Sequence, residues 1–208
     1  MREIAGGESH TYLISLAPGQ FVRILVEQKA VDLALKFAGP DRKQLTEANF
    51  TGVGSLESLS AEASTGGEYQ LTISIVGPAT LAGSYRVELE IKAAAAPQDK
   101  QRITAERLLD EARKSYEKGG EALEPGVEKA RQALALWREL GDRYWEGVAV
   151  YLIGNGNLRA KKYDQAIEAY KQALDIRREV KDRGGEGNTL HSLGNSCLAL
   201  NRDRKSVV

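Results

Sequence analysis

The chain is poor in cysteine and aromatic residues, and it has no excess of charge of either sign. Its one cysteine, Cys197, excludes an internal disulfide and a metal site built from several cysteines. Lys plus Arg and Asp plus Glu each number 29, so the basic excess of a nucleic-acid-binding protein is absent. No apolar run approaches the roughly 18 residues of a membrane-spanning helix, and the first residues contain no apolar segment of the signal-peptide type.

The first part of the chain alternates apolar and polar side chains with a period of two. This is the pattern of a strand with one buried face, and it is clearest from Tyr85 to Ile91. Turns rich in glycine and proline separate the runs, as in Ala17-Pro18-Gly19. Strands are expected at or near residues 2–5, 11–16, 21–28, 31–37, 44–51, 56–63, 69–75 and 85–91. Their spacing predicts an antiparallel β-sandwich over residues 1–92.

The pattern breaks at residues 93–100, which we interpret as a linker. An alanine run leads to Pro97, and Asp99 is suited to cap the helix that follows. From residue 101 the apolar period becomes helical. The predicted fold class is therefore multidomain, all-β plus all-α, with a helical domain at residues 101–202 and a tail at residues 203–208.

The helical part repeats itself at an offset of 40 residues. Asp142-Arg143 aligns with Asp182-Arg183, and Gly154-Asn155 aligns with Gly194-Asn195. Gln132-Ala133-Leu134 aligns in the same way with Gln172-Ala173-Leu174. A fixed period of this size indicates stacked supersecondary units.

The repeat resembles the tetratricopeptide repeat (TPR), in a slightly lengthened form. The positions that carry the resemblance are Val150, Ile153, Gly154, Ala166, Tyr170 and Ala173, while Asn157 stands where an aromatic residue is usual. The resemblance implies an α-solenoid of about two and a half helical hairpins. It also implies a concave surface that binds a peptide or protein partner.

By carry-over from the resemblance, nine residues line that surface: Val148, Tyr151, Asn155, Leu158, Arg159, Asn188, His191, Asn195 and Leu198. Asn155 and Asn195 are the residues best suited to bind an extended peptide, because an amide side chain both donates to and accepts from a peptide backbone. A role in solubility, or in a local hydrogen bond within the hairpin, explains the presence of the two asparagines nearly as well.

No catalytic, cofactor or metal site is predicted, and the chain is not expected to be an enzyme. Cys197 and His191 lie six residues apart on one expected helix, which places them far round it from each other. We therefore interpret Cys197 as a packing residue and His191 as a groove residue. Asp32 and Asp41 are two oxygen donors that alone make a weak calcium site.

The sandwich resembles the bacterial pre-peptidase C-terminal domain. Gly67 and Tyr69, Gly83 and Tyr85, and the upstream Gly39-Pro40-Asp41 carry this resemblance. Together with the repeats it resembles the front half of bacterial proteins that end in a caspase-like CHAT peptidase domain, of which no residue is present.

Three hypotheses for function follow. The first is a non-catalytic scaffold that binds a peptide through the concave repeat face. The second is a regulatory or targeting part of a CHAT-type cysteine peptidase. The third is a sandwich that binds carbohydrate or a cell-surface polymer, which needs exposed aromatic residues such as Tyr12, Phe21 and Phe50.

We also expect the chain to be a fragment. The third hairpin has its first helix but no second helix, which predicts a partly uncovered stripe of Leu190, Leu193 and Cys197 and self-association through it. Residues 203–208 resemble the translation of a sequencing-library adapter. Sandwiches of this type favour a location outside the cytoplasm for a parent protein, and a cytoplasmic location stays open.

Overall fold

The computed structural model describes residues 1–206, and Val207 and Val208 of the expected tail lie outside the described residues. The chain divides into two compact units, Met1–Arg107 and Leu108–Val208. We call them the sandwich unit and the helical unit. The boundary lies inside the first long helix, α1 (Pro97–Lys118). The prediction of a β-sandwich followed by a helical repeat is confirmed.

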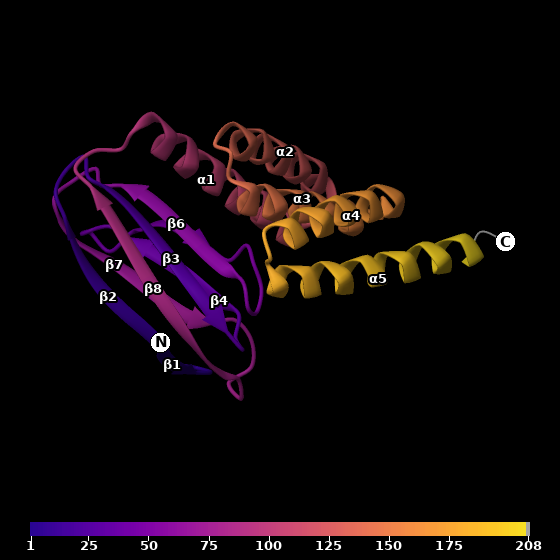
Figure 1. The fold of residues 1–208 in the computed structure, drawn as a ribbon, viewed down its shortest axis with the longest axis horizontal. Coiled ribbons are helices and arrows are strands. Elements are labelled where there is room, and N and C mark those ends of the chain that lie inside the picture. Colours follow the sequence, from indigo (N-terminus) through magenta and orange to yellow (C-terminus); the bar gives the residue numbers. More distant parts are fainter. Residues whose placement is uncertain (207–208) are drawn as a thin grey trace. The chain divides into compact units, whose positions relative to one another are not determined.

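The sandwich unit contains two four-stranded antiparallel sheets (Figure 1). One sheet has the order β1-β8-β3-β6 and the other β2-β7-β4-β5. The strands are β1 (Arg2–Ala5), β2 (Ser9–Leu16), β3 (Phe21–Lys29), β4 (Leu33–Ala38), β5 (Gln44–Ala48), β6 (Leu56–Glu62), β7 (Gly67–Ile75) and β8 (Ala82–Lys92).

The core lies between the two sheets. Because apolar and polar residues alternate along the strands, the apolar face of each strand points into this core. Phe37 on β4 and Tyr69 on β7 are fully buried and stack with their ring centroids 5.5 Å apart. Val22 and Ile24 on β3 are also fully buried. Burial of each such side chain stabilises the fold by about 1.5–3 kcal/mol, which explains why the pattern fixes the strand register.

The end of β8 departs from the expected pattern. Leu89 and Ile91 share a face with the buried Tyr85, yet they are 47% and 42% exposed. β1 pairs with β8 only from Ala82 to Tyr85, so the later part of β8 is an edge strand on that side. Alternation identifies which side chains share a face, but strand pairing contributes to how deeply they are buried.

The start of α1 is fixed by an acidic residue at its third position. Asp99 accepts a hydrogen bond from the backbone N–H of Ala96 at 3.0 Å and an ion-paired one from Lys92 at 2.7 Å. Pro97 is the first helical residue, where a missing N–H costs nothing. Asp99 therefore does stabilise the helix start, but from inside the first turn rather than from the residue before it.

The part of α1 that belongs to the sandwich unit is attached to β6 through one buried carboxylate. Glu106 accepts hydrogen bonds from the Ser58 hydroxyl at 2.8 Å, from the Ser60 backbone N–H at 2.6 Å and from the Ser60 hydroxyl at 3.2 Å. Its side chain is buried, and burial raises its pKa. Because β6 is the outer strand of its sheet, Glu106 also satisfies an edge N–H that would otherwise be available to another strand.

A second buried carboxylate lies at the start of β6. Glu57 is fully buried, and its Oε1 accepts hydrogen bonds from the backbone N–H groups of Phe50 and Thr51 and from the Thr51 hydroxyl. Among the described residues its Oε2 has no hydrogen-bond partner. Burial raises the pKa of Glu57 to about 8, and the neighbouring Asp32 adds to the effect. Burial also raises the pKa of Asp32 to about 6.

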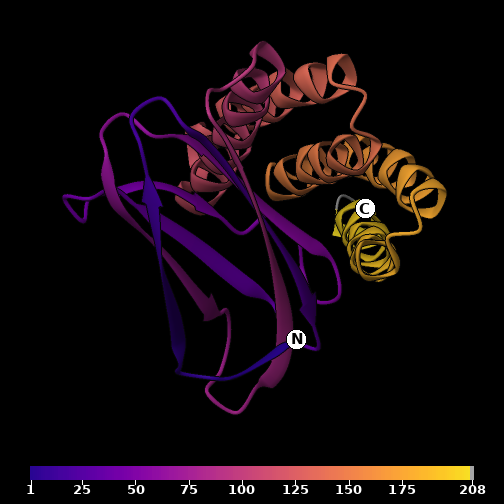
Figure 2. The same cartoon turned by 60° about the vertical axis from the view of Figure 1, so that its left-hand side comes forward.

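The helical unit is a series of antiparallel helices, shown from two directions in Figures 1 and 2. After α1 come a short 3₁₀ turn, η1 (Gly120–Ala122), and the helices α2 (Leu123–Glu139), α3 (Arg143–Arg159), α4 (Tyr163–Glu179) and α5 (Arg183–Ser206). α5 continues through residues 203–206, so this part of the expected tail is helical. Within residues 1–206, no helix is long and apolar enough to cross a membrane.

Replacing Glu106 with alanine is expected to destabilise the sandwich unit by about 2–3 kcal/mol, because three buried donors lose their acceptor. Both tryptophans, Trp137 and Trp145, lie in the helical unit, so backbone hydrogen exchange in β6 is the appropriate measurement. Glu62→Ala is the matched control, since it removes only the exposed ion pair with Lys100 at 3.6 Å. Equal protection of β6 in both variants would contradict this role of Glu106.

The stability of the sandwich unit should fall as the pH rises between about 4.5 and 8. Over that interval Glu57 ionises in the unfolded chain but stays protonated in the fold, so deprotonation favours unfolding. Glu57→Gln resembles the protonated form and should flatten this dependence above pH 6, while the raised pKa of Asp32 leaves a smaller decline below pH 6. The measurement is the thermal unfolding midpoint of both proteins across the interval. A parallel decline in the variant would mean that another group is responsible.

Candidate functional site

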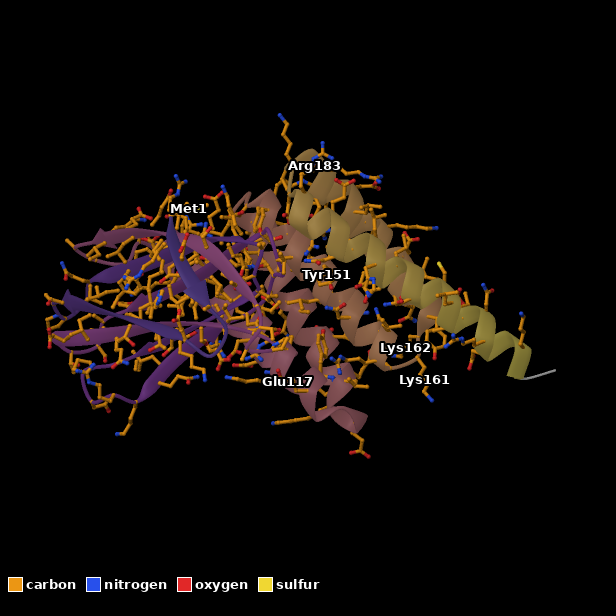
Figure 3. The ribbon with its side chains drawn as sticks, turned by 90° about the horizontal axis from the view of Figure 1, so that it is seen from below. Met1, Glu117, Tyr151, Lys161, Lys162 and Arg183 are labelled. Atoms are coloured by element: carbon orange, nitrogen blue, oxygen red, sulfur yellow. The ribbon has the colours of Figure 1, made fainter. Side chains whose placement is uncertain are left out.

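The nine residues expected on the concave surface come from α3 and α5, the first helices of two successive repeats. The two helices are linked directly, since the Tyr151 hydroxyl on α3 lies 3.2 Å from the Ser192 hydroxyl on α5. Figure 3 shows Tyr151 in the middle of the helical unit. The structure therefore brings the two halves of the predicted site close together.

The nine side chains differ in their exposure. Arg159, His191, Asn195 and Leu198 are exposed, and Tyr151, Asn155, Leu158 and Asn188 are half-buried. Val148 is fully buried, so its side chain has no surface to offer a ligand and serves packing instead. The exposed members concentrate on α5, and Leu198 is the most exposed of its large apolar residues at 58%.

The two equivalent amides have different environments. The Asn155 carbonyl oxygen accepts a hydrogen bond of 2.7 Å from the hydroxyl of Tyr170 on α4. Burial raises the pKa of that phenol well above its usual range, so it stays a donor. Asn195 lies in the open, with its Nδ2 3.0 Å from Nε2 of His191. Both amides therefore make a local hydrogen bond, but Asn155 is half-buried whereas Asn195 and His191 are exposed.

A buried arginine that the sequence pattern does not identify contacts both helices of this surface. Arg177 on α4 is 2% exposed and donates to the backbone oxygen of Gly185 and, at 2.8 Å, to the hydroxyl of Thr189. Its guanidinium also lies 4.4 Å from the ring centroid of Tyr151. Burial lowers the pKa of Arg177, but a guanidinium remains charged at any ordinary pH. Arg177 thus joins α3, α4 and α5 at one point.

The repeat itself contains the signal for Arg177. At an offset of 40 residues, Arg177 corresponds to Trp137 and Gly185 corresponds to Trp145. Trp137 and Trp145 pack against each other with ring centroids 5.7 Å apart. The contact between two tryptophan rings in one repeat is therefore replaced in the next repeat by a hydrogen bond from a guanidinium to a glycine carbonyl. The two substitutions are linked because the residues at both positions contact each other in each repeat.

The helical unit has a hollow that is lined by residues of α2, α3 and α4. Its volume is about 750 Å³, and polar residues such as Arg131, Asp164 and Gln165 form much of its lining. Asn157 also lines it, 3% exposed, and its Oδ1 has no hydrogen-bond partner in the described part of the chain. Asn157 stands at the position where the repeat usually has an aromatic residue.

The residues considered for a catalytic pair or a calcium site make other contacts or lie exposed. His191 is hydrogen-bonded to Asn195, and Cys197 is exposed on the same helix. Within residues 1–206, no group of three or more His, Cys, Asp or Glu residues gathers to hold a metal ion. Asp41 accepts from the Lys43 backbone N–H at 3.1 Å, as a turn residue does.

The sandwich unit has few aromatic residues free to stack on a sugar. Phe21 and Phe50 are buried, which contradicts the exposure that the carbohydrate hypothesis requires. Tyr12 is half-buried and hydrogen-bonded to the Tyr85 hydroxyl at 2.7 Å. His10 bonds the same hydroxyl through Nδ1 at 2.6 Å. These contacts make a polar cluster that holds β2 and β8 together.

Tyr170→Phe is expected to lower the stability of the helical unit by about 1 kcal/mol, because the Asn155 oxygen loses its donor while the ring still packs. Urea unfolding followed by tryptophan fluorescence measures this directly. Tyr163→Phe on the same helix is the control and should leave the midpoint unchanged. An unchanged midpoint in both variants would mean that water replaces the phenol at no cost.

Comparison with known proteins agrees with the helical geometry. The sequence profile of the tetratricopeptide repeat matches residues 126–179 and again residues 147–207. The two matches overlap at α3 and α4 and together span α2 to α5. No curated protein matches the chain. Residues 126–207, which contain most of α2 and all of α3 and α4, are therefore similar to tetratricopeptide repeats, and a β-sandwich precedes them in the chain.

Proposed function

We propose that the helical unit is a protein-interaction module that binds an extended peptide on the surface formed by α3 and α5. The observation that carries the proposal is the pairing of equivalent polar residues from successive repeats on two helices in direct contact. Asn155 and Asn195 hold the same place in their repeats, and the bond between Tyr151 and Ser192 joins their helices. Tetratricopeptide repeats generally mediate protein–protein interaction, which supports this assignment.

The chemistry of the surface suits a peptide main chain. The exposed side chains offer a guanidinium at Arg159, an imidazole at His191 and an amide at Asn195. These groups donate to carbonyl oxygens, and the amide also accepts from a backbone N–H. Leu198 adds an apolar contact for one side chain of the peptide. The proposed role is that of a non-catalytic scaffold.

We propose further that the sandwich unit is of the pre-peptidase C-terminal type and that the chain corresponds to the front part of a CHAT-type peptidase. The glycine–tyrosine pairs at the starts of β7 and β8 support this, as does the arrangement of eight antiparallel strands in two sheets. In that setting the peptide surface would serve to target or regulate a peptidase domain.

The experiment is a selection of random 12-residue peptides on the purified chain, followed by binding measurements on variants. Asn195→Ala and His191→Ala should each weaken the selected peptides about tenfold, since each removes a hydrogen bond to the main chain. Gln172→Ala, on the hollow lined by α2, α3 and α4, is the matched control. Peptides weakened only by the control substitution would place the binding site in that hollow and refute the proposal.

A further inference from the structure

The last helix, α5, repeats α3 in both sequence and packing. Arg178 on α4 donates to Glu186 on α5 at 2.8 Å, as Arg138 on α2 donates to Glu146 on α3 at 2.9 Å. These pairs are separated by 40 residues, the period of the sequence repeat. α5 therefore rests on α4 as α3 rests on α2, and Figure 2 shows α5 as the last layer after α4.

The opposite face of α3 is covered closely by α4. A Cβ atom on Gly154 would lie 2.6 Å from the ring of Tyr170, and one on Gly147 would lie 3.0 Å from the side chain of Ile176. Between these two glycines on the same face, Val150 is only 2% exposed. This face of α3 is thus shaped by two glycines that admit side chains of the next helix.

The same face of α5 is open. Gly187 and Gly194 correspond to Gly147 and Gly154, and a Cβ on either would meet nothing within 4 Å. Leu190 corresponds to Val150 and is 45% exposed. Cys197, one turn further along the face, is exposed as well. The predicted uncovered stripe is therefore present, except that Leu193 is half-buried.

Charge at the edge of the face indicates what covers it. Arg143 at the start of α3 bonds Glu179 at the end of α4, with Nη2 to Oε2 at 2.6 Å. Its equivalent Arg183 has a side chain that is 89% exposed and reaches Glu186 of its own helix at 3.4 Å. Figure 3 shows Arg183 at the start of α5. A covering helix with an acidic residue near its end would complete this pair.

We propose that the face of α5 formed by Arg183, Gly187, Leu190, Gly194 and Cys197 binds an amphipathic partner helix with the pattern of α4. That pattern is an aromatic residue flanked by two alanines, at the spacing of Ala166, Tyr170 and Ala173, and a glutamate nine residues after the aromatic one. The aromatic ring enters the space beside Gly194, and the glutamate pairs with Arg183.

A second copy of the chain fits this face less well. Its own Tyr170 is fully buried against α3 and is not available to another molecule. Its α5 face carries glycines where the partner needs a ring, so two such faces leave the space beside Gly194 unfilled. The partner is therefore a different helix, and self-association is the competing outcome of the test.

The probe is a labelled synthetic peptide with the sequence of residues 162–181, which contains α4. Saturable binding to the whole chain is expected, with slower hydrogen exchange over residues 186–200 when the peptide is bound. Gly194→Leu fills the space and should weaken binding at least tenfold. The variant itself should fold, because nothing lies within 4 Å and leucine favours a helix more than glycine does.

The peptide could also bind by displacing the native α4 from α3. Charge reversal distinguishes this exchange from binding to the face of α5. A peptide with Glu179→Arg should bind the unchanged chain more weakly and recover on Arg183→Glu. Gln172→Ala in the chain, exposed on the hollow lined by α2, α3 and α4, should leave binding of the α4 peptide unchanged. The proposal fails if the peptide does not bind, or if Gly194→Leu binds it equally well. It also fails if ultracentrifugation shows a dimer that Gly194→Leu abolishes while the peptide has no effect.

Discussion

The close approach of α3 and α4 at Gly154 is the constraint on which the helical unit depends. The ring of Tyr170 occupies the place where any larger residue at position 154 would have its side chain. The same tyrosine then reaches Asn155 through its hydroxyl, so one residue sets both the spacing of the helices and the orientation of a surface amide. Because each hairpin buries its apolar face only against its neighbours, a contact of this kind determines where the next helix can lie.

The sequence was sufficient to predict the order and class of the elements. Period-two alternation located the strands of the sandwich, and the 40-residue offset located the helices, because both follow directly from which side chains must be buried. The sequence was a poorer guide to which side chains are buried on edge strands. Leu89 and Ile91 follow the alternation yet remain exposed, since burial depends on which strands are neighbours and the pattern of one strand does not contain that information.

The candidate surface was predictable in outline but not in detail. The repeat placed Tyr151, Asn155 and Asn195 on two helices that do meet, yet it also placed Val148 there, which is buried. The buried polar groups could not have been predicted, because Glu106 and Arg177 are ordinary charged residues of amphipathic helices until their neighbours are known. Arg177 comes nearest to being predictable, since the offset aligns it with Trp137 and aligns Gly185 with Trp145, a paired exchange that a single position does not reveal.

Comparison of the two repeats separates the residues that serve packing from those that are free to bind. Where both repeats have the same residue in different surroundings, the difference lies in the neighbouring helix. Gly154 and Gly194 are identical, but one faces a tyrosine ring and the other faces open space. Arg143 and Arg183 are also identical, but one is paired across the helix interface and the other extends outward. Residues such as Gly194 and Arg183, which the repeat keeps for packing, are thus exposed on α5. Because they have the geometry of an interior contact between helices, this face of α5 is suited to recognise a helix rather than an extended chain.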